Sequence, residues 1–354
     1  MGKDSIKSKR YLQKAETAVI ALLAFFIYFF LNDEADEEFS SAGSSETLPL
    51  RQTETEPLER EAGSLIFFDG EIEKAASRLA DEAKSSIKIA TYTYAKSGFT
   101  QLLERRAKEG LKVRVVAGRN KDNSAPVFDF VVLSMKSGIY HPKFMVFDSK
   151  DVLISSANIS SDPGAGNNAV LFFDVPEAAA LLEAEIDDQF GGKNVRRCED
   201  GCESEIGTIY FNPGHGCAAV RDELLKAGGR IYAGIYTMTL KNPMVTGLKK
   251  AAKRGIDISI VVDNWHGREG RAVNSGAFDF LQSIGISMFF DESGEADERV
   301  FHHKSAVVDG RTTVLGSMNW TASGCYKNRE LIVINRDAGV AESFEKYFKN
   351  FTVR

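Results

Sequence analysis

The chain has 354 residues, of which 43% are hydrophobic and 27% are charged, so it is too apolar and too long for a disordered protein. Four cysteines in this length exclude a scaffold built from disulfides. The formal net charge of −6 comes from segment 32–62, which has two basic and ten acidic residues, whereas the part from residue 63 onward is close to neutral. The charge therefore neither requires nor excludes a nucleic-acid partner, because a basic groove can lie on a neutral domain.

The first 62 residues divide into three parts by composition. The stretch 15–31 contains an unbroken apolar run of 14 residues. Its length matches that of the shortest membrane-spanning helices, which have about 17 residues. A basic tail, 1–14, precedes this run, and an acidic segment, 32–62, follows it. A cleaved signal peptide would share these features, but no small-x-small cleavage pattern follows closely. We therefore predict an uncleaved transmembrane anchor at 15–31 and a flexible linker at 32–62.

The charges around this anchor predict its orientation. Basic residues tend to remain on the cytosolic side, so we expect the N-terminus in the cytosol and the rest of a single-pass membrane protein on the other side. An anchor in the outer membrane of an organelle, such as the mitochondrion, would not follow this rule. The organelle therefore stays open.

The chain after the linker repeats its own pattern. IKIATYTY at 87–94 and RIYAGIYTM at 230–238 are both apolar, β-rich segments typical of strands. Each is followed by a helical segment that ends at a glycine, Gly110 in one copy and Gly255 in the other, and then by another strand pattern. Strands that alternate with helices predict an α/β sheet in each half.

A duplicated domain typically folds as a pseudo-symmetric pair. We therefore expect an α/β protein with two such domains, 63–195 and 206–354, joined by a junction at 196–205. Each domain is predicted to be a mixed sheet flanked by helices, with one active site shared at the interface.

Two segments carry the residues for chemistry: HPKFMVFDSKDVLISSANIS at 141–160 and HHKSAVVDGRTTVLGSMNWT at 302–321. Both read His-x-Lys-x4-Asp, followed ten residues later by an Asn that has a Ser two positions before it. Equivalent residues are all 161 positions apart: His141 and His302, Lys143 and Lys304, Asp148 and Asp309, Ser156 and Ser317, Asn158 and Asn319. Coincidence does not explain so many residue types repeated in register.

These residue types in this spacing are typical of a phosphoryl-transfer site. On a strand, side chains two positions apart point to the same face, so each His is expected beside its Lys. Lys and Asn supply positive charge and hydrogen-bond donors for the oxygens of a phosphodiester. One imidazole can attack phosphorus while the other protonates the leaving oxygen, since the pKa of histidine lies near neutrality. Neither segment has the carboxylate cluster of a two-metal phosphodiesterase, so we expect no metal or other cofactor.

The two segments resemble the HKD motifs of the phospholipase D superfamily, and the resemblance covers about residues 64–352. Within the superfamily, HHKSAVVD, GSMNWT and NRE are similar to segments of the group that includes mitochondrial cardiolipin hydrolase, Zucchini and the endonuclease Nuc. Members of that group carry one motif and complete their site by forming dimers. Because this chain carries two motifs, we expect a monomer to be sufficient for a complete site.

The resemblance implies a covalent phosphohistidine intermediate. His141 is then expected to be the nucleophile, and His302 the general acid and afterwards the general base. The residues expected to hold the phosphate are Lys143, Lys304, Asn158, Asn319, Ser156 and Ser317. Asp148 and Asp309 belong to the catalytic motifs as well, where we expect them to position the motif through hydrogen bonds rather than to react.

One position differs between the repeats. Eleven residues after its Asn, the second repeat has Glu330, whereas the first repeat has Ala169. The resemblance implies that Glu330 hydrogen-bonds an imidazole of the opposite motif. It would then orient His141 and raise its basicity, while His302 would have no such partner. This asymmetry favours His141 as the nucleophile.

Three functions are compatible with these motifs. The main hypothesis is a membrane-anchored phosphodiesterase that hydrolyses phospholipids. The first alternative is an endonuclease that cuts single-stranded RNA or DNA, for which Arg119, Lys121, Arg268 and Arg271 are candidate groove residues. The second alternative is a non-catalytic scaffold that retains a phosphate pocket. The sequence leaves open which head group or polymer is cut, and whether water or an alcohol accepts the phosphatidyl group.

The cysteines near the junction form a separate question. Cys198, Cys202 and Cys217 cluster with His215, and this spacing fits no common zinc finger. Free cysteines are the default expectation, with a disulfide or a zinc site as alternatives. His303 is expected to have a packing role beside the motif.

Overall fold

The computed structural model describes residues 63–352, apart from 70, 159–165, 194, 264–274 and 292–299. The predicted tail, anchor and linker at 1–14, 15–31 and 32–62 lie outside the described residues, as do the groove candidates Arg268 and Arg271. In the described part of the chain, no helix has the length and apolar character needed to cross a membrane.

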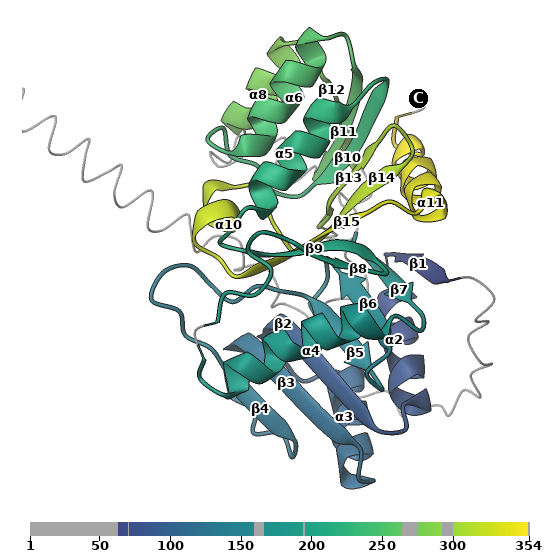
Figure 1. Cartoon of the computed structure of the whole chain (residues 1–354), viewed down its shortest axis with the longest axis vertical. Coiled ribbons are helices and arrows are strands. Elements are labelled where there is room, and N and C mark those ends of the chain that lie inside the picture. Colours follow the sequence, from purple (N-terminus) through teal and green to yellow (C-terminus); the bar gives the residue numbers. More distant parts are fainter. Residues whose placement is uncertain are drawn as a thin grey trace, which may run out of the picture. The chain divides into compact units, whose positions relative to one another are not determined.

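The first half of the described chain forms a mixed sheet of seven strands in the order β1-β7-β6-β5-β2-β3-β4 (Figure 1). Strands β2, β3 and β4 are parallel, whereas β5, β6, β7 and β1 are antiparallel to their neighbours. Its elements are β1 (Ser64–Phe68), α2 (Glu71–Glu82), β2 (Ser86–Tyr94), α3 (Gly98–Lys108), β3 (Lys112–Asn120), β4 (Asp129–Val132), β5 (Phe144–Phe147), β6 (Asp151–Ser155), β7 (Asn168–Phe172) and α4 (Pro176–Phe190).

The second half forms a sheet of eight strands in the order β12-β11-β10-β13-β14-β15-β9-β8. Its centre repeats the first sheet, because β10 pairs in parallel with β11 and antiparallel with β13, as β2 does with β3 and β5. Its elements are β8 (Cys202–Ser204), β9 (Gly207–Asn212), α5 (Gly216–Lys226), β10 (Arg230–Ile235), α6 (Pro243–Lys253), β11 (Asp257–Asp263), α8 (Ser275–Ser283), β12 (Ser287–Asp291), β13 (Lys304–Val308), β14 (Thr312–Gly316), α10 (Ala322–Tyr326), β15 (Glu330–Asn335) and α11 (Ala338–Lys349). The expected α/β class with two mixed sheets is confirmed.

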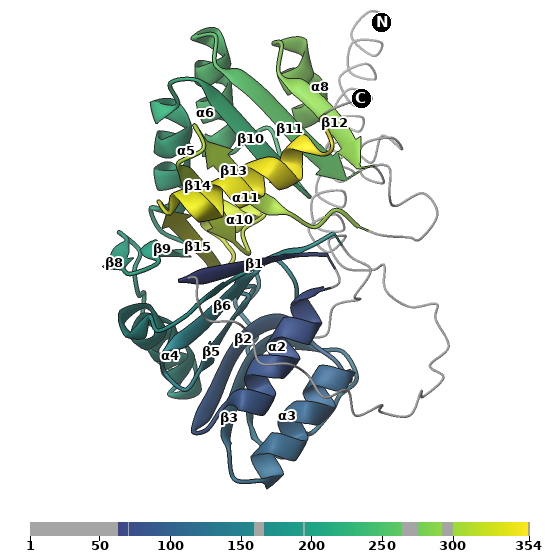
Figure 2. The same ribbon diagram turned by 90° about the vertical axis from the view of Figure 1, so that its right-hand side faces the viewer.

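Helices cover both faces of each sheet (Figures 1 and 2). In the first half, α2 and α3 pack on one face and α4 on the other; in the second half, α5, α6 and α8 share one core and α11 packs opposite. The core on the α4 and α11 side contains buried residues from both sheets, such as Phe144 and Leu331. The two halves therefore share a hydrophobic core, which stabilises their arrangement around a common site.

Equivalent helices end in equivalent ways. Gly110 follows the last turn of α3 with φ +99°, and Gly255 follows the last turn of α6 with φ +81°. Glycine adopts positive φ at little cost, so these residues end the helices and return the chain to β3 and β11. The predicted helix ends are confirmed.

Backbone pairing joins the two halves beside the motifs. The amide of His141 donates to the carbonyl of Arg329 at 2.9 Å, and the amide of His302 donates to the carbonyl of Gly166 at 2.7 Å. Arg329 also forms a buried bidentate ion pair with Glu185 of α4, at 2.5 and 3.0 Å. The segment that leads into each motif is thus held by the opposite repeat.

The four cysteines form two disulfides, so the default expectation of free thiols is wrong. Cys198 pairs with Cys202 near the junction, and Cys217 of α5 pairs with Cys325 of α10. The second bond joins residues 108 positions apart, so Cys325 lies outside the cluster of cysteines near the junction. Because these bonds use all of its cysteines, the zinc alternative at this cluster is also excluded.

Candidate active site

Both motif histidines stand just before a central strand, at the edge where the halves meet. His141 and Lys143 precede β5, and His302 precedes β13, which begins at Lys304. Lys143 and Lys304 are only 1% and 2% exposed, and His141 is 4% exposed. The charges of Lys143 and Lys304 both lower the pKa of each histidine. The two motifs therefore form one site, as predicted for a shared interface.

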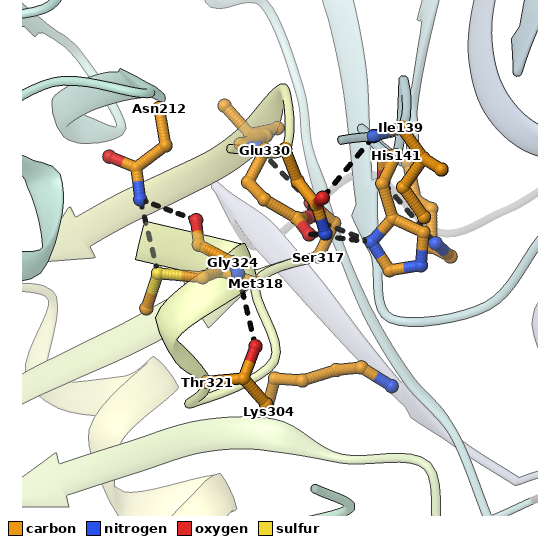
Figure 3. A network of polar contacts seen from close by, with 12 residues as sticks. Ile139, His141, Asn212, Lys304, Ser317, Met318, Thr321, Gly324 and Glu330 are labelled. Atoms are coloured by element: carbon orange, nitrogen blue, oxygen red, sulfur yellow. Dashed lines mark hydrogen bonds and ion pairs between the residues drawn. The ribbon is translucent and has the colours of Figure 1, made fainter. Parts of the chain in front are cut away.

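Glu330 of the second repeat contacts His141 of the first. Its carboxylate oxygens lie 2.9 and 2.8 Å from Nδ1 of His141 (Figure 3). Ser317 Oγ donates to the same carboxylate at 2.5 Å, and Asn328 donates at 3.2 Å. Because Nδ1 of the neutral imidazole donates to a carboxylate, Nε2 retains its lone pair for attack. The contact implied by the resemblance is therefore present.

His302 has a partner that the sequence reasoning missed. Nδ1 of His302 lies 3.1 Å from the amide oxygen of Asn167, a residue of the first repeat equivalent to Asn328. As expected, His302 has no carboxylate partner among the described residues, and a neutral amide takes that place. An amide can orient the ring, but it stabilises the protonated imidazolium less than a carboxylate does.

Burial and the neighbouring lysines keep both imidazoles neutral. Burial lowers the pKa of His141 to about 4, with a further lowering by Lys143 and Lys304, although Glu330 acts in the opposite direction. Burial lowers the pKa of His302 well below its ordinary value, and the two lysines add to this effect. His141 is therefore in the form of a nucleophile at neutral pH.

The two lysines make this site one for an anion. Lys143 Nζ donates to the carbonyl of His141 at 3.2 Å, and Lys304 Nζ donates to that of His302 at 2.9 Å. Two buried ammonium groups, those of Lys143 and Lys304, lie in this site together with the carboxylate of Glu330. Positive charge and hydrogen-bond donors of this kind suit the oxygens of a phosphodiester.

The motif asparagines follow β6 and β14, the second strands of the two hairpins. The oxygen of Asn158 accepts a hydrogen bond from the amide of Thr93 at 3.3 Å, which leaves its NH2 group as a donor toward a substrate. Asn319 is 3% exposed and directly precedes the fully buried Trp320. Phosphate binding by both asparagines stays a prediction.

The motif serines have hydrogen-bond partners within the protein, and phosphate binding by them stays a prediction. Ser317 Oγ accepts from the amide of Leu331 at 3.0 Å and donates to Glu330. Ser156 Oγ accepts from the amide of Asn168 at 2.9 Å. Both serines are fully buried, and their hydroxyls hold the strands that carry the histidine partners.

The motif aspartates hold the turns of the two hairpins through hydrogen bonds, which is the role expected for them. Asp148 accepts from the amides of Lys84, Ser85 and Ser86, which lead into β2. Asp309 accepts equivalent bonds from Gly228, Gly229 and Arg230, which lead into β10. Five positions of extended chain separate each Asp from its Lys, about 16 Å at the usual rise. The hydrogen-bonding role expected for them is therefore present, but far from the reacting atoms.

His303 has the packing role that was expected. Its ring stacks on Phe301 with centroids 4.4 Å apart, and its Nδ1 lies 2.8 Å from the amide nitrogen of Asn168. Burial lowers its pKa to about 3. This neutral ring belongs to the core shared by the two halves.

Two aromatic residues at the site were not predicted as site residues. Tyr92 lies 5.4 Å from the ring of His141, and Tyr236 lies 4.6 Å from the ring of His302, measured between centroids. The sequence contains one indication of their role, because the two tyrosines occupy equivalent positions in the repeated strand segments 87–94 and 230–238. Those segments were interpreted only as strands.

Comparison with known proteins identifies the family. Residues 77–189 and 220–352 match the family described as "Cardiolipin synthase, PLD-like domain". The chain belongs to this phospholipase D-like family. The resemblance read from the two motifs is thus confirmed, and the two matched stretches correspond to the two sheets of the phospholipase D-like fold.

Several proteins from other organisms resemble parts of the chain. Mitochondrial cardiolipin hydrolase of Xenopus tropicalis is 31% identical over 96 residues, 27% of this chain and 42% of that protein. The human enzyme of the same name is 31% identical over 103 residues, 28% of this chain and 38% of that protein. A phospholipase D of Rickettsia conorii is 27% identical over 148 residues, 42% of this chain and 69% of that protein. The chain therefore spans about two fifths of the cardiolipin hydrolases.

A solved structure extends the fold comparison to both halves. Phosphatidylserine synthase of Haemophilus influenzae superposes with a TM-score of 0.63 over 82% of this chain and 86% of that protein, at 13% identity. The phospholipase D-like fold is thus shared across nearly the whole of that enzyme.

Proposed function

We propose that the protein is a membrane-anchored phosphodiesterase that hydrolyses phospholipids through a phosphohistidine intermediate. The observation that carries this proposal is the His141–Glu330 pair, set beside two buried lysines in a site with a second histidine. Relatives named cardiolipin hydrolase and phospholipase D support a lipid substrate.

In the first step, Nε2 of His141 attacks phosphorus. An N–P bond forms, the P–O bond to the leaving group breaks, and the leaving oxygen takes a proton from His302. Lys143 and Lys304 balance the charge on the phosphoryl oxygens. His302 must carry a proton for this step. The negative charge of the bound phosphodiester offsets the lysines and raises the pKa of His302 above its value without the anion.

In the second step, water replaces the first leaving group. Neutral His302 accepts a proton from water as the oxygen attacks phosphorus, the N–P bond breaks, and His141 returns to its neutral form. Glu330 stabilises the positive charge that develops on His141 in the first step, as a carboxylate partner of histidine does in other enzymes.

The proposal includes an N-terminal anchor at 15–31 and a catalytic domain outside the cytosol. The two disulfides support this location, since disulfides persist in oxidising compartments. The names of the mitochondrial relatives support a mitochondrial membrane as one destination. Protease protection of the full-length protein in sealed organelles, followed by fractionation, tests both points.

The test of activity uses the full-length protein in vesicles of phosphatidylcholine and cardiolipin, in the presence of EDTA. We expect release of phosphatidic acid by the wild type and none by His141→Ala. Labelled single-stranded RNA and DNA are assayed in parallel. Cleavage of nucleic acid without lipid turnover would replace the lipid proposal by the endonuclease alternative. Phosphate binding without turnover of any substrate would favour the scaffold.

A further inference from the structure

Two tyrosines occupy equivalent places in the two repeats. Tyr92 lies in β2 and Tyr236 directly follows β10, the strands that pair with β5 and β13 of the motifs. Tyr236 is 6% exposed, whereas Tyr92 is only partly buried. Each aromatic ring therefore stands on the strand next to the one that carries its motif.

Each ring contacts both the histidine and the lysine of its own motif. Lys304 Nζ lies over the ring of Tyr236, 4.7 Å from the centroid, and the ring of His302 meets Tyr236 at 4.6 Å and 62°. Lys143 Nζ lies 5.9 Å from the centroid of Tyr92, which is 5.4 Å from the ring of His141. The same three-residue arrangement thus occurs twice.

An aromatic face attracts an ammonium group, and the attraction grows when the group is removed from water. Lys143 and Lys304 are almost fully buried, so each ring face helps to keep its ammonium charged and in place before an anion binds. The edge-to-face contact between Tyr236 and His302 is also a favourable arrangement of two rings.

We propose that Tyr92 and Tyr236 are positioning residues: each ring holds the phosphate-binding lysine and the histidine of its motif in place. The inference rests on the proposed function, since it concerns the groups that would bind and cleave the phosphodiester. It assigns the role to the ring face and not to the phenolic hydroxyl.

The two tyrosines differ in importance. His141 is oriented by the carboxylate of Glu330, whereas the partners of His302 are uncharged, namely the amide oxygen of Asn167 and the backbone of Ser156. The ring of Tyr236 also lies closer to its lysine and its histidine than that of Tyr92 does. The second motif therefore depends more on its tyrosine than the first.

The test compares Tyr236→Leu and Tyr92→Leu with Tyr236→Phe and Tyr92→Phe in the full-length protein. Tyr232→Leu is the matched control, because Tyr232 lies in the same strand β10 and contacts a different lysine, Lys349, at 5.5 Å. Calorimetry measures the Kd of inorganic phosphate. Hydrolysis of bis(p-nitrophenyl) phosphate in EDTA gives kcat and KM separately, and circular dichroism checks folding.

We expect Tyr236→Leu to weaken phosphate binding and to lower kcat by about tenfold, in line with loss of a desolvated cation–π contact. Tyr92→Leu should have a smaller effect in the same direction. The two Phe variants and Tyr232→Leu should stay within about twofold of the wild type, because the ring faces at the site are retained.

Three results would overturn the inference. These are folded Leu variants with wild-type phosphate affinity and kcat, Phe variants as impaired as the Leu variants, or an equal loss in Tyr232→Leu. If Tyr236→Leu does not fold, the partly exposed Tyr92 decides the question through its Leu and Phe variants. The Kd of phosphate is measured without a lipid. If the protein does not hydrolyse phospholipids, this measurement therefore still tests the role of the two tyrosines.

Discussion

The two motif histidines have different neighbours although their motifs are near copies. Nδ1 of His141 faces the carboxylate of Glu330, and Nδ1 of His302 faces the amide oxygen of Asn167. A carboxylate stabilises positive charge on the ring more than an amide does. This difference supports His141 as the residue that becomes cationic on attack, and His302 as the residue that gives up its proton easily.

Glu330→Gln keeps the shape of this contact but removes its charge. Glu330 acts to raise the pKa of His141 against the lowering by burial, so the variant should lower that pKa further and weaken the nucleophile. We expect kcat at pH 7 to fall by about 10- to 100-fold, as for other supporting carboxylates. Rapid-quench measurement of the phosphoenzyme tests whether the first step is the one that slows.

Ser317→Ala provides the companion to this variant. It removes one hydrogen bond to Glu330 but leaves the charge, so its effect on kcat should be smaller. A wild-type rate of phosphoenzyme formation in Glu330→Gln would remove this carboxylate from the mechanism.

The hairpins β5–β6 and β13–β14 each have an aspartate in the turn, and its carboxylate holds the start of the neighbouring strand, β2 or β10. Asp148 and Asp309 have φ of 52° and 53°, a left-handed conformation that Asp tolerates better than most residues. Each carboxylate accepts hydrogen bonds from backbone amides at the start of β2 or β10. The hydrogen bonds outweigh partial burial and hold the pKa of both groups below the ordinary value.

Asp309→Ala should therefore affect stability more than catalysis. Loss of several charge-assisted hydrogen bonds at a partly exposed turn is expected to lower the free energy of unfolding by about 1–2 kcal/mol. Because the turn lies far from the phosphate site, kcat should change by less than about threefold. Urea denaturation and steady-state kinetics measure the two effects, with Asp309→Asn as the milder control. A loss of kcat in folded protein would return this residue to the active site.

The disulfide between α5 and α10 closes a long loop. Cys217 and Cys325 enclose 108 positions, whereas Cys198 and Cys202 are 4 apart. In the chain-entropy account, a loop of this length stabilises the fold by about 4–5 kcal/mol and a very short one by much less. The double variant Cys217→Ala/Cys325→Ala should therefore lower Tm clearly more than Cys198→Ala/Cys202→Ala. Equal Tm changes in the two variants, measured without reductant, would contradict this account.

Three histidines, His141, His302 and His303, lie where the two halves of the molecule meet, and this links stability to pH. The pKa values of His141 and His303 are lowered by burial to about 4 and about 3, and that of His302 is also lowered by burial. In the unfolded chain these residues take up protons near pH 6.5. Below that pH the unfolded state binds more protons than the folded state, so acid favours unfolding.

The free energy of unfolding should accordingly be highest above about pH 6.5 and fall as the pH is lowered toward 4. His141 alone would contribute a loss of about 3 kcal/mol over that range. Urea titrations between pH 7 and pH 5 measure the slope before most carboxylates titrate. His141→Gln, which cannot titrate, should give a shallower slope. An identical slope in the variant would show that this histidine is not buried in its neutral form.

Local patterns in the chain were sufficient for the architecture and for most of the site. The period of two in the strands, the glycines that end α3 and α6, and the motif repeated 161 positions apart are properties of neighbouring residues. They predict two similar α/β halves with His141, Lys143, His302 and Lys304 at their meeting edge. Such features can be read from sequence because side-chain direction on a strand follows from spacing alone.

The tertiary structure decided which groups meet across that edge. Asn167 contacts His302, and Cys217 forms a disulfide with Cys325. The hydroxyls of Ser156 and Ser317 form hydrogen bonds to side chains within the protein. These contacts depend on how two sheets pack through a shared core, and no spacing along the chain encodes that packing. The sequence by itself determined which chemical groups the site contains. The packing of the halves determined which partner contacts each histidine and therefore its pKa, because burial and neighbouring charges set that pKa.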